Sequence, residues 1–228
     1  MPDASPAQSP GYALVTGASS GIGEQIAREY ARRGVPLVLT ARRAERLQAL
    51  AEELQAQVPV EVVAADLADP AAPAALSSEL EQRGVRVRIL VNNAGYGLPG
   101  RYRSSDWSDH AAFLQVMVTA VCELTWRLLP SIRASGEGRI LNVASFAALM
   151  PAADGQTLYA PAKSFLVKFS EALALENAER GVKVTALCPD FLIDVLPSTV
   201  TPDNPKRYPE PITAQGYLEE RLREIKLK

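Results

Sequence analysis

The stretch Thr16-Gly17-Ala18-Ser19-Ser20-Gly21-Ile22-Gly23 decides the fold that this sequence predicts. It follows an apolar run at 12–16 and precedes a helical apolar pattern at 22–33, so it predicts a glycine-rich turn between a strand and a helix. Glycines at these positions allow a tight turn, a close phosphate approach and close packing of the helix on the sheet. Unpaired N–H groups in the first helical turn would attract phosphates. A turn that only reverses the chain is the alternative interpretation.

The same alternation of strand and helix continues outward from this turn. Predicted strands at 12–16, 37–40, 60–64, 87–91, 139–143 and 182–187 alternate with predicted helices at 22–33, 44–57, 70–83, 108–134 and 156–179. This order predicts a single α/β domain over residues 12–189, with a doubly wound parallel sheet in three layers. Pro130 is expected to kink or stop its helix.

The two ends of the chain break this pattern. Residues 1–11 are rich in Pro, Ser and Ala and are expected to form a disordered tail. Residues 190–228 are expected to form a short irregular tail beside the substrate, ending in a helix at 214–227. No seventh strand is recognisable, so we expect the sheet to lack its last strand.

Composition excludes several classes of function. The 24 basic and 26 acidic residues give a net charge of −2, which argues against a nucleic-acid partner. A single histidine, His110, and two cysteines, Cys122 and Cys188, match no metal-site spacing, and the cysteines are expected to be buried free thiols. No run approaches the ~18 apolar residues of a membrane span, and the N-terminus lacks a secretory signal, so we expect a cytoplasmic location.

Three polar residues near the end of the predicted sheet could carry chemistry. Tyr159 and Lys163 are four residues apart on a predicted helix and share a face. An adjacent ammonium favours the phenolate and would lower the tyrosine pKa toward the range of a general acid/base. Ser145 follows the strand at 139–143. Taken alone, the pair also fits a surface contact and the serine a turn residue.

Several motifs in a fixed order resemble those of the short-chain dehydrogenase/reductase family, from Tyr12 to Pro189. They are the glycine turn, Asp66, Asn92-Asn93-Ala94-Gly95, Ser145 and Tyr159-x-x-x-Lys163. The resemblance implies a Rossmann-type fold and hydride transfer between a nicotinamide cofactor and a carbonyl or alcohol. It implies that Tyr159 acts as general acid/base, that Lys163 also reaches the nicotinamide ribose, and that Ser145 donates to the substrate oxygen.

The resemblance also implies a set of cofactor contacts. Asp66 would bond the adenine amino group, or alternatively cap the helix near Pro70, and Asn93 would line the ribose side of the cleft. The full set is Thr16, Gly17, Ser19, Ser20, Gly21, Ile22, Gly23, Arg42, Asp66, Asn93, Ala94, Gly95, Tyr159, Lys163 and Pro189.

The residues after the strand at 37–40 favour NADP(H) over NAD(H). Ala41 stands where the family would place the acid that holds a ribose 2′-hydroxyl, and Arg42 follows it. A guanidinium there can pair with a 2′-phosphate. Alternatively, Arg42 and Arg43 are solvated charges, although positive charge is unfavourable at a helix start.

The resemblance weakens at three places. Met117 stands where the family often has asparagine, Asp190 replaces a glycine, and the last strand is not recognisable. Ser145 and Tyr159 are also one residue further apart than expected, which an insertion around 152–155 would explain. An NADP(H)-binding pseudoenzyme with a structural or regulatory role is therefore the second hypothesis. A protein scaffold that binds no nucleotide is the third.

Two long segments bear on partners and substrate. By resemblance, the helices at 108–134 and 156–179 would pair across a two-fold axis in a homodimer or homotetramer. Alternatively, both are wide core helices. The substrate would contact residues 96–102, the stretch after Ser145 and the tail. These segments are mostly apolar or aromatic, so we expect a small, apolar carbonyl or alcohol substrate.

Overall fold

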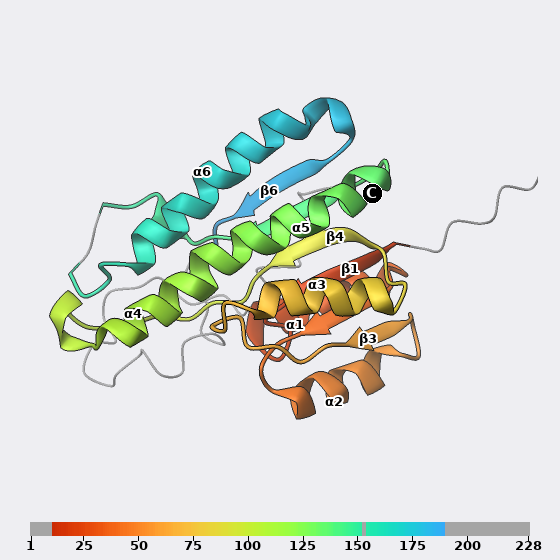
Figure 1. The fold of residues 1–228 in the computed structure, drawn as a ribbon, viewed down its shortest axis with the longest axis horizontal. Coiled ribbons are helices and arrows are strands. Elements are labelled where there is room, and N and C mark those ends of the chain that lie inside the picture. The colour runs from red at the N-terminus through yellow and green to blue at the C-terminus, as the bar shows by residue number, and fades with distance from the viewer. Residues whose placement is uncertain (1–10, 152–153, 190–228) are drawn as a thin grey trace, which may run out of the picture.

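A computed structural model describes residues 11–151 and 154–189 (Figure 1). Several expectations fall outside these described residues. They concern the N-terminal tail, part of the segment with the predicted insertion, Asp190, the expected lack of a last strand and the final helix.

Six parallel strands form one sheet in the order β3-β2-β1-β4-β5-β6. Their bounds are β1 (Tyr12–Thr16), β2 (Leu37–Thr40), β3 (Val60–Val62), β4 (Val87–Asn92), β5 (Arg139–Val143) and β6 (Lys183–Leu187). The strand order reverses at β1, which lies between β2 and β4. In sheets of this kind, ligands bind beyond the carboxyl ends of the strands at the reversal point. The predicted Rossmann-type sheet is confirmed.

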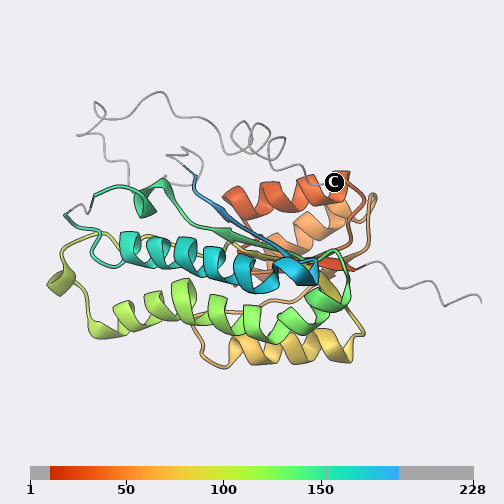
Figure 2. The ribbon, with the colours of Figure 1, turned by 90° about the horizontal axis from the view of Figure 1, so that it is seen from above.

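Helices cover both faces of the sheet. Figure 2 shows α1 (Gly21–Arg32) and α2 (Ala44–Leu54) on one face, and α3 (Ala72–Gln82), α5 (Ala120–Ala134) and α6 (Tyr159–Asn177) on the other. Successive side chains of each strand point to opposite faces of the sheet. In β1, Ala13 and Val15 pack with α1 and α2, whereas Leu14 packs with α3 and α5. The three predicted layers are therefore present.

The long helical run before β5 differs from the prediction in two ways. It passes from α4 (Trp107–Leu114) through a π-helical turn, η2 (Gln115–Thr119), into α5. Pro130 was expected to kink or stop this helix; it does not stop it, because α5 continues to Ala134, the predicted end. Leu124 and Ile132, on either side of the proline, are fully buried. Burial of this face against the sheet outweighs the loss of one helical hydrogen bond.

The same run, Trp107–Ala134, is long and apolar enough to cross a membrane by length and composition alone. The expectation that no segment approaches that size is corrected in this respect. In its most apolar window, 44% is buried inside the protein, and α5 packs along β4. Burial against a sheet is what a core helix of an α/β domain shows.

Candidate active site

The glycine turn between β1 and α1 has a steric reason for each of its glycines. Gly17 and Gly21 have φ values of 67° and 59°, which side chains disfavour. A Cβ on Gly23 would lie 2.4 Å from Asn93 Nδ2 and 2.5 Å from the carbonyl oxygen of Gly17. The turn therefore has the tight geometry that the sequence predicted.

The end of β4 holds this turn in place. Asn93 Nδ2 donates to the carbonyl oxygens of Thr16 at 2.9 Å and of Gly17 at 3.3 Å. Thr16 Oγ1 accepts from the backbone N–H groups of Asn93 and Ala94 and donates to the carbonyl oxygen of Val91. The side chain of Asn93, expected beside a ribose, thus supports the turn itself.

The N-terminus of α1 fits a diphosphate group. Its N-cap residue, Ser20, has an extended backbone, and its side chain makes no capping hydrogen bond. The N–H groups of the first turn are therefore not capped by that side chain and can face an anion. The two left-handed glycines and the lack of room for a Cβ at Gly23 keep the chain close to the place such a group would take. The residues present fit a dinucleotide.

Arg43, which the sequence indicated only as a possible solvated charge, contacts the glycine turn. Its guanidinium donates to Ser19 Oγ, at 3.2 Å from Nε and 2.9 Å from Nη2, and to Ser20 Oγ at 2.7 Å. Arg42, which was predicted to bind the 2′-phosphate, is exposed. Its charge acts on Tyr96, where it opposes the rise in pKa that burial causes. Both arginines therefore lie near the turn, and Arg43 contacts it directly.

Asp66 does not cap the next helix. α3 begins at Ala72, and Asp66 Oδ1 instead accepts from the N–H of Ala68 at 3.0 Å. The alternative capping role is wrong because the turn at 66–69 separates Asp66 from the helix. Its exposed carboxylate also raises the pKa of Tyr96, so these two groups lie at the same edge of the sheet.

Tyr159 and Lys163 lie together in the first turns of α6. Lys163 Nζ is 5.7 Å from the centroid of the Tyr159 ring and donates to the carbonyl oxygen of Val143 at 2.7 Å. The lysine is only 6% exposed. Burial lowers its pKa from 10.5 to about 8, and the charge interaction with Cys188 acts in the opposite direction. The structure places the ammonium beside the phenol.

Ser145 stands two residues beyond β5, on the loop that packs against α6. Its Oγ accepts from the N–H of Ala147 at 3.2 Å, which leaves the hydroxyl proton for another acceptor. Ser164 Oγ, from α6, donates to the carbonyl oxygen of Ala148 at 2.9 Å and holds the two segments together. This arrangement suits a serine that donates to a substrate oxygen.

Cys188 and Pro189 adjoin this loop from the end of β6. The backbone of Ser145 hydrogen-bonds the Cys188 thiol, and Pro189 accepts from the N–H of Phe146 at 2.9 Å. Cys122 and Cys188 are free but only partly buried, whereas full burial was expected. Burial raises the pKa of Cys188, and the backbone hydrogen bond and Lys163 oppose that rise.

Met117 stands where the family often has an asparagine. It lies in the π-helical turn and packs in an apolar cluster with Phe113, Ala162 and Tyr159. A Cβ on Gly95 would come within 2.9 Å of its sulfur, so Met117 contacts the end of the Asn92–Gly95 motif closely. Short π-helical turns occur often at functional sites. The side of Tyr159 that faces α4 is therefore apolar.

A buried polar network beneath the site was also missed. Asn92 Nδ2 donates to Asn142 Oδ1 at 2.8 Å, and Asn142 Nδ2 donates to Ser170 Oγ at 2.8 Å. Asn92 Nδ2 also lies 3.3 Å from Thr125 Oγ1. The network links β4 and β5 to α5 and α6. Asn92 ends the apolar run of β4, and Asn142 interrupts the apolar run of β5. A polar residue at such a position is the one sequence signal that could have identified the network.

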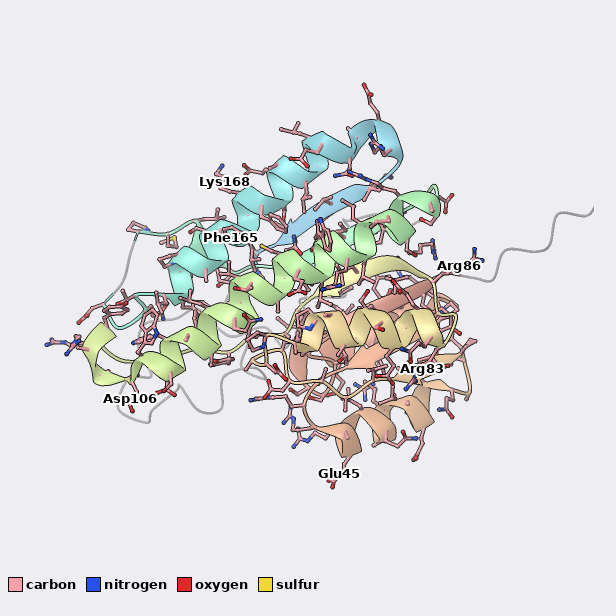
Figure 3. All side chains as sticks on the ribbon, in the orientation of Figure 1. Glu45, Arg83, Arg86, Asp106, Phe165 and Lys168 are labelled. Atoms are coloured by element: carbon pink, nitrogen blue, oxygen red, sulfur yellow. The ribbon has the colours of Figure 1, made fainter. Side chains whose placement is uncertain are left out.

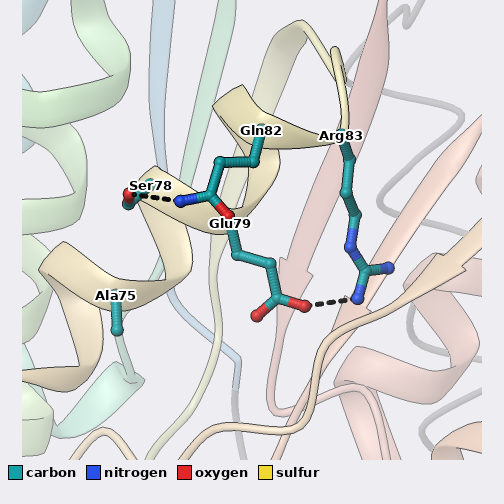
Figure 4. A pocket seen from close by; sticks show the side chains of 5 residues that line it. All are labelled: Ala75, Ser78, Glu79, Gln82 and Arg83. Carbon is teal, nitrogen blue, oxygen red and sulfur yellow. Dashed lines mark hydrogen bonds and ion pairs between the residues drawn. The ribbon is translucent and has the colours of Figure 1, made fainter.

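A shallow pocket on α3 lies away from these residues (Figure 4). Its polar side chains bond one another, since Gln82 Nε2 donates to Ser78 Oγ and Arg83 pairs with Glu79. We regard it as a surface feature of the helix.

Known proteins are similar to this chain in sequence and in architecture. A family model described as short chain dehydrogenase matches residues 11–195. Sulfoacetaldehyde reductase of Chromohalobacter salexigens is 41% identical over 178 residues, which cover 77% of this chain and 70% of that protein. A short-chain dehydrogenase from Sphingobium yanoikuyae in complex with NADPH is similar with a TM-score of 0.82 and 32% identity, covering 94% of this chain and 84% of that one. The bulky-bulky ketone specific alcohol dehydrogenase from Comamonas testosteroni has a TM-score of 0.82 and 29% identity, covering 94% and 82%.

Proposed function

The chain belongs to the short-chain dehydrogenase family. From this we propose that each of its site residues has a separate role in one hydride-transfer reaction. The protein is an oxidoreductase that moves a hydride between NADP(H) and a carbonyl or alcohol carbon. When bound, the cofactor supplies or accepts the hydride. The observation that carries the assignment of residues is the buried ammonium of Lys163 beside the ring of Tyr159.

In the direction of reduction, Tyr159 donates its phenolic proton to the carbonyl oxygen. Ser145 donates a hydrogen bond to the same oxygen as negative charge develops there. The positive charge of Lys163 stabilises the phenolate that remains. Oxidation of an alcohol uses the same groups in reverse, with Tyr159 as general base.

The turn and the two arginines would hold NADP(H). The N-terminus of α1 accommodates the diphosphate, and Arg42 and Arg43 provide positive charge where NAD-binding relatives of this fold usually have an acid. The contact of Arg43 with Ser19 and Ser20 supports a role for both arginines rather than for Arg42 alone.

The pseudoenzyme hypothesis gains no support. Ser145, Tyr159 and Lys163 are all present. Met117 stands at a different position and replaces none of these three residues. Titration of NADPH and NADH by fluorescence, followed by NADPH oxidation with a carbonyl panel, tests the assignment. We expect Tyr159→Phe to keep NADPH affinity and to lose turnover by at least about 100-fold. Binding without turnover by the unaltered protein would restore the pseudoenzyme hypothesis.

A homodimer or homotetramer is also proposed, with α5 and α6 at its interface. Trp126 on α5 and Phe165 on α6 are exposed, and the rings of Phe165 and Phe169 stack at 5.5 Å. Figure 3 labels Phe165 and Lys168 on α6. Exposed aromatic groups on adjacent helices favour an interface. Light scattering of Trp126→Lys would test it, with a smaller particle expected.

The cytoplasmic location stays a prediction.

A further inference from the structure

Most of the large apolar side chains that the described residues expose lie at one edge of the sheet. Three exceptions, Trp126, Phe165 and Leu175, lie on α5 and α6. The other six belong to two segments, which we call the β4 wall (96–107) and the β5 wall (146–150). They are Tyr96, Tyr102, Trp107, Phe146, Leu149 and Met150. Surface loops are usually polar, so such a concentration indicates a binding function.

Buried groups hold the exposed rings of the β4 wall in place. The ring of Tyr96 meets the fully buried Phe113 edge-on, with centroids 5.5 Å apart. His110, also buried, donates from Nε2 to the carbonyl oxygen of Tyr102 at 2.8 Å, and its ring lies 4.8 Å from the Tyr102 ring. The wall is therefore an ordered surface.

The β5 wall is apolar throughout and equally well anchored. Residues 146–150 read Phe-Ala-Ala-Leu-Met and carry no polar side chain. The hydrogen bonds from Phe146 N–H to Pro189 and from Ser164 Oγ to Ala148 fix its backbone. Leu149 and Met150 nevertheless remain 61% and 52% exposed.

The two walls adjoin the residues of the candidate site. The β5 wall begins directly after Ser145, and the β4 wall follows the Asn92–Gly95 motif that contacts Met117. Farther out, the N–H of Gly100 donates to the carbonyl oxygen of Gly155 at 3.2 Å, which joins the loops after β4 and β5. Leu98 of the β4 wall packs against the same cluster as Tyr159, so a substrate bound at Ser145 and Tyr159 would lie next to both walls.

We propose that the substrate is a neutral ketone, or the matching secondary alcohol, with a ring-sized or larger apolar group on each side of the reacting carbon. This inference rests on the proposed function. An aldehyde or a methyl ketone would leave one wall in water, whereas two bulky groups bury both. The occupant is the substrate because the walls begin beside the reacting groups.

Charge favours a neutral substrate over an anionic one. Arg101 and Arg103 flank Tyr102, but Asp106 and Asp109 follow within the next turn. The β4 wall and the start of α4 therefore carry both signs, and the β5 wall carries no charge. A small anion such as a sulfonate would meet mixed charge at the β4 wall and only apolar side chains at the β5 wall.

The first test compares kcat/KM with NADPH for three carbonyls. We use 1-phenyl-1-hexanone, which has two apolar groups, acetone and sulfoacetaldehyde. The expected result is a kcat/KM at least about tenfold higher for 1-phenyl-1-hexanone. A preference for acetone or sulfoacetaldehyde overturns the inference but leaves the proposed function intact. If NADPH binds and no carbonyl is reduced across a broad panel, the proposed function fails.

The second test uses variants of exposed residues, which should fold normally. Leu149→Ser and Met150→Ser should each raise KM for 1-phenyl-1-hexanone by about tenfold and reduce the preference over acetone, with kcat changing less. Leu175→Ser is the matched control, since Leu175 is 82% exposed on α6. Equal effects of Leu149→Ser and Leu175→Ser overturn the inference. The inference is also overturned if Leu149→Ser changes the oligomer size and leaves KM unchanged, because a second copy of the chain would then cover the β5 wall.

Discussion

Lys163 donates a hydrogen bond of 2.7 Å from Nζ to the backbone carbonyl oxygen of Val143, inside the protein. One of its three N–H groups is therefore bonded to β5. The ammonium is held beside Tyr159 at the cost of its hydration, and its pKa falls to about 8. This loss of hydration should lower the free energy of unfolding of the cofactor-free protein.

We expect Lys163→Met to stabilise the cofactor-free protein at pH 7. The folded pKa lies below the unfolded value of about 10.5, so between these values the unfolded chain binds more protons and stability rises with pH. Below about pH 8, burial of the charged lysine lowers the free energy of unfolding by about 3 kcal/mol. The hydrogen bond to Val143 offsets part of this loss. The gain from Lys163→Met should shrink as pH rises from 8 to 10.5, as measured by urea unfolding.

Lys168→Met is the matched control for this measurement. Lys168 lies on the same helix, but its side chain is 79% exposed and pairs with Glu171 at the surface. Its removal should change stability little and without the same pH dependence. If the two variants share one pH profile, burial is not the cause of the Lys163 effect.

The fold could be predicted in most of its parts from apolar periodicity. Strands at 12–16, 37–40 and 139–143 have the predicted bounds, and each of these short runs directly follows a glycine or a proline. Helix ends agreed less well. α2 ends at Leu54 instead of Gln57, and α6 begins at Tyr159 instead of Gln156. The caps at these ends use backbone geometry, which leaves no clear mark in the sequence.

The site contacts depend on residues far apart in the chain. Arg43 reaches Ser19 across 24 residues, and Asn142 joins Asn92 across 50. No local pattern contains such a contact. The family motifs identified Tyr159 and Lys163, but the bond to Val143 required the fold. The π-helical turn at Met117 was likewise invisible because its side chains follow an ordinary apolar stripe.

Gly23→Ala should weaken NADPH binding by at least about tenfold and lower the free energy of unfolding by about 1–3 kcal/mol. The added methyl would overlap Asn93 Nδ2 and the carbonyl oxygen of Gly17, so the turn must shift. Gly97→Ala is the control, since its methyl meets nothing within 4 Å. Fluorescence titration and thermal unfolding measure both effects. Unchanged NADPH affinity in Gly23→Ala would contradict the importance of this contact.

Asn142→Ala should lower the free energy of unfolding by about 2–4 kcal/mol. Asn142 is fully buried, and its loss removes hydrogen bonds to Asn92 and Ser170 and leaves a small cavity. Ser170→Ala removes one of these bonds and should cost about half as much. Chemical denaturation gives both values. Equal losses would contradict a cost that grows with the number of hydrogen bonds and the volume removed.

Arg43→Ala and Arg42→Ala should both weaken NADPH more than NADH, because only NADPH carries the 2′-phosphate. A charge-assisted pair contributes about 1.5–3 kcal/mol, so we expect NADPH affinity to fall by about tenfold or more. Arg43 also bonds Ser19 and Ser20, so its loss should weaken NADH somewhat as well, whereas loss of the exposed Arg42 should not. Arg46→Ala, one turn along α2, controls for net charge. Equal losses of NADPH and NADH in Arg43→Ala would show that Arg43 only orders the turn, and Arg42 would then carry the preference alone.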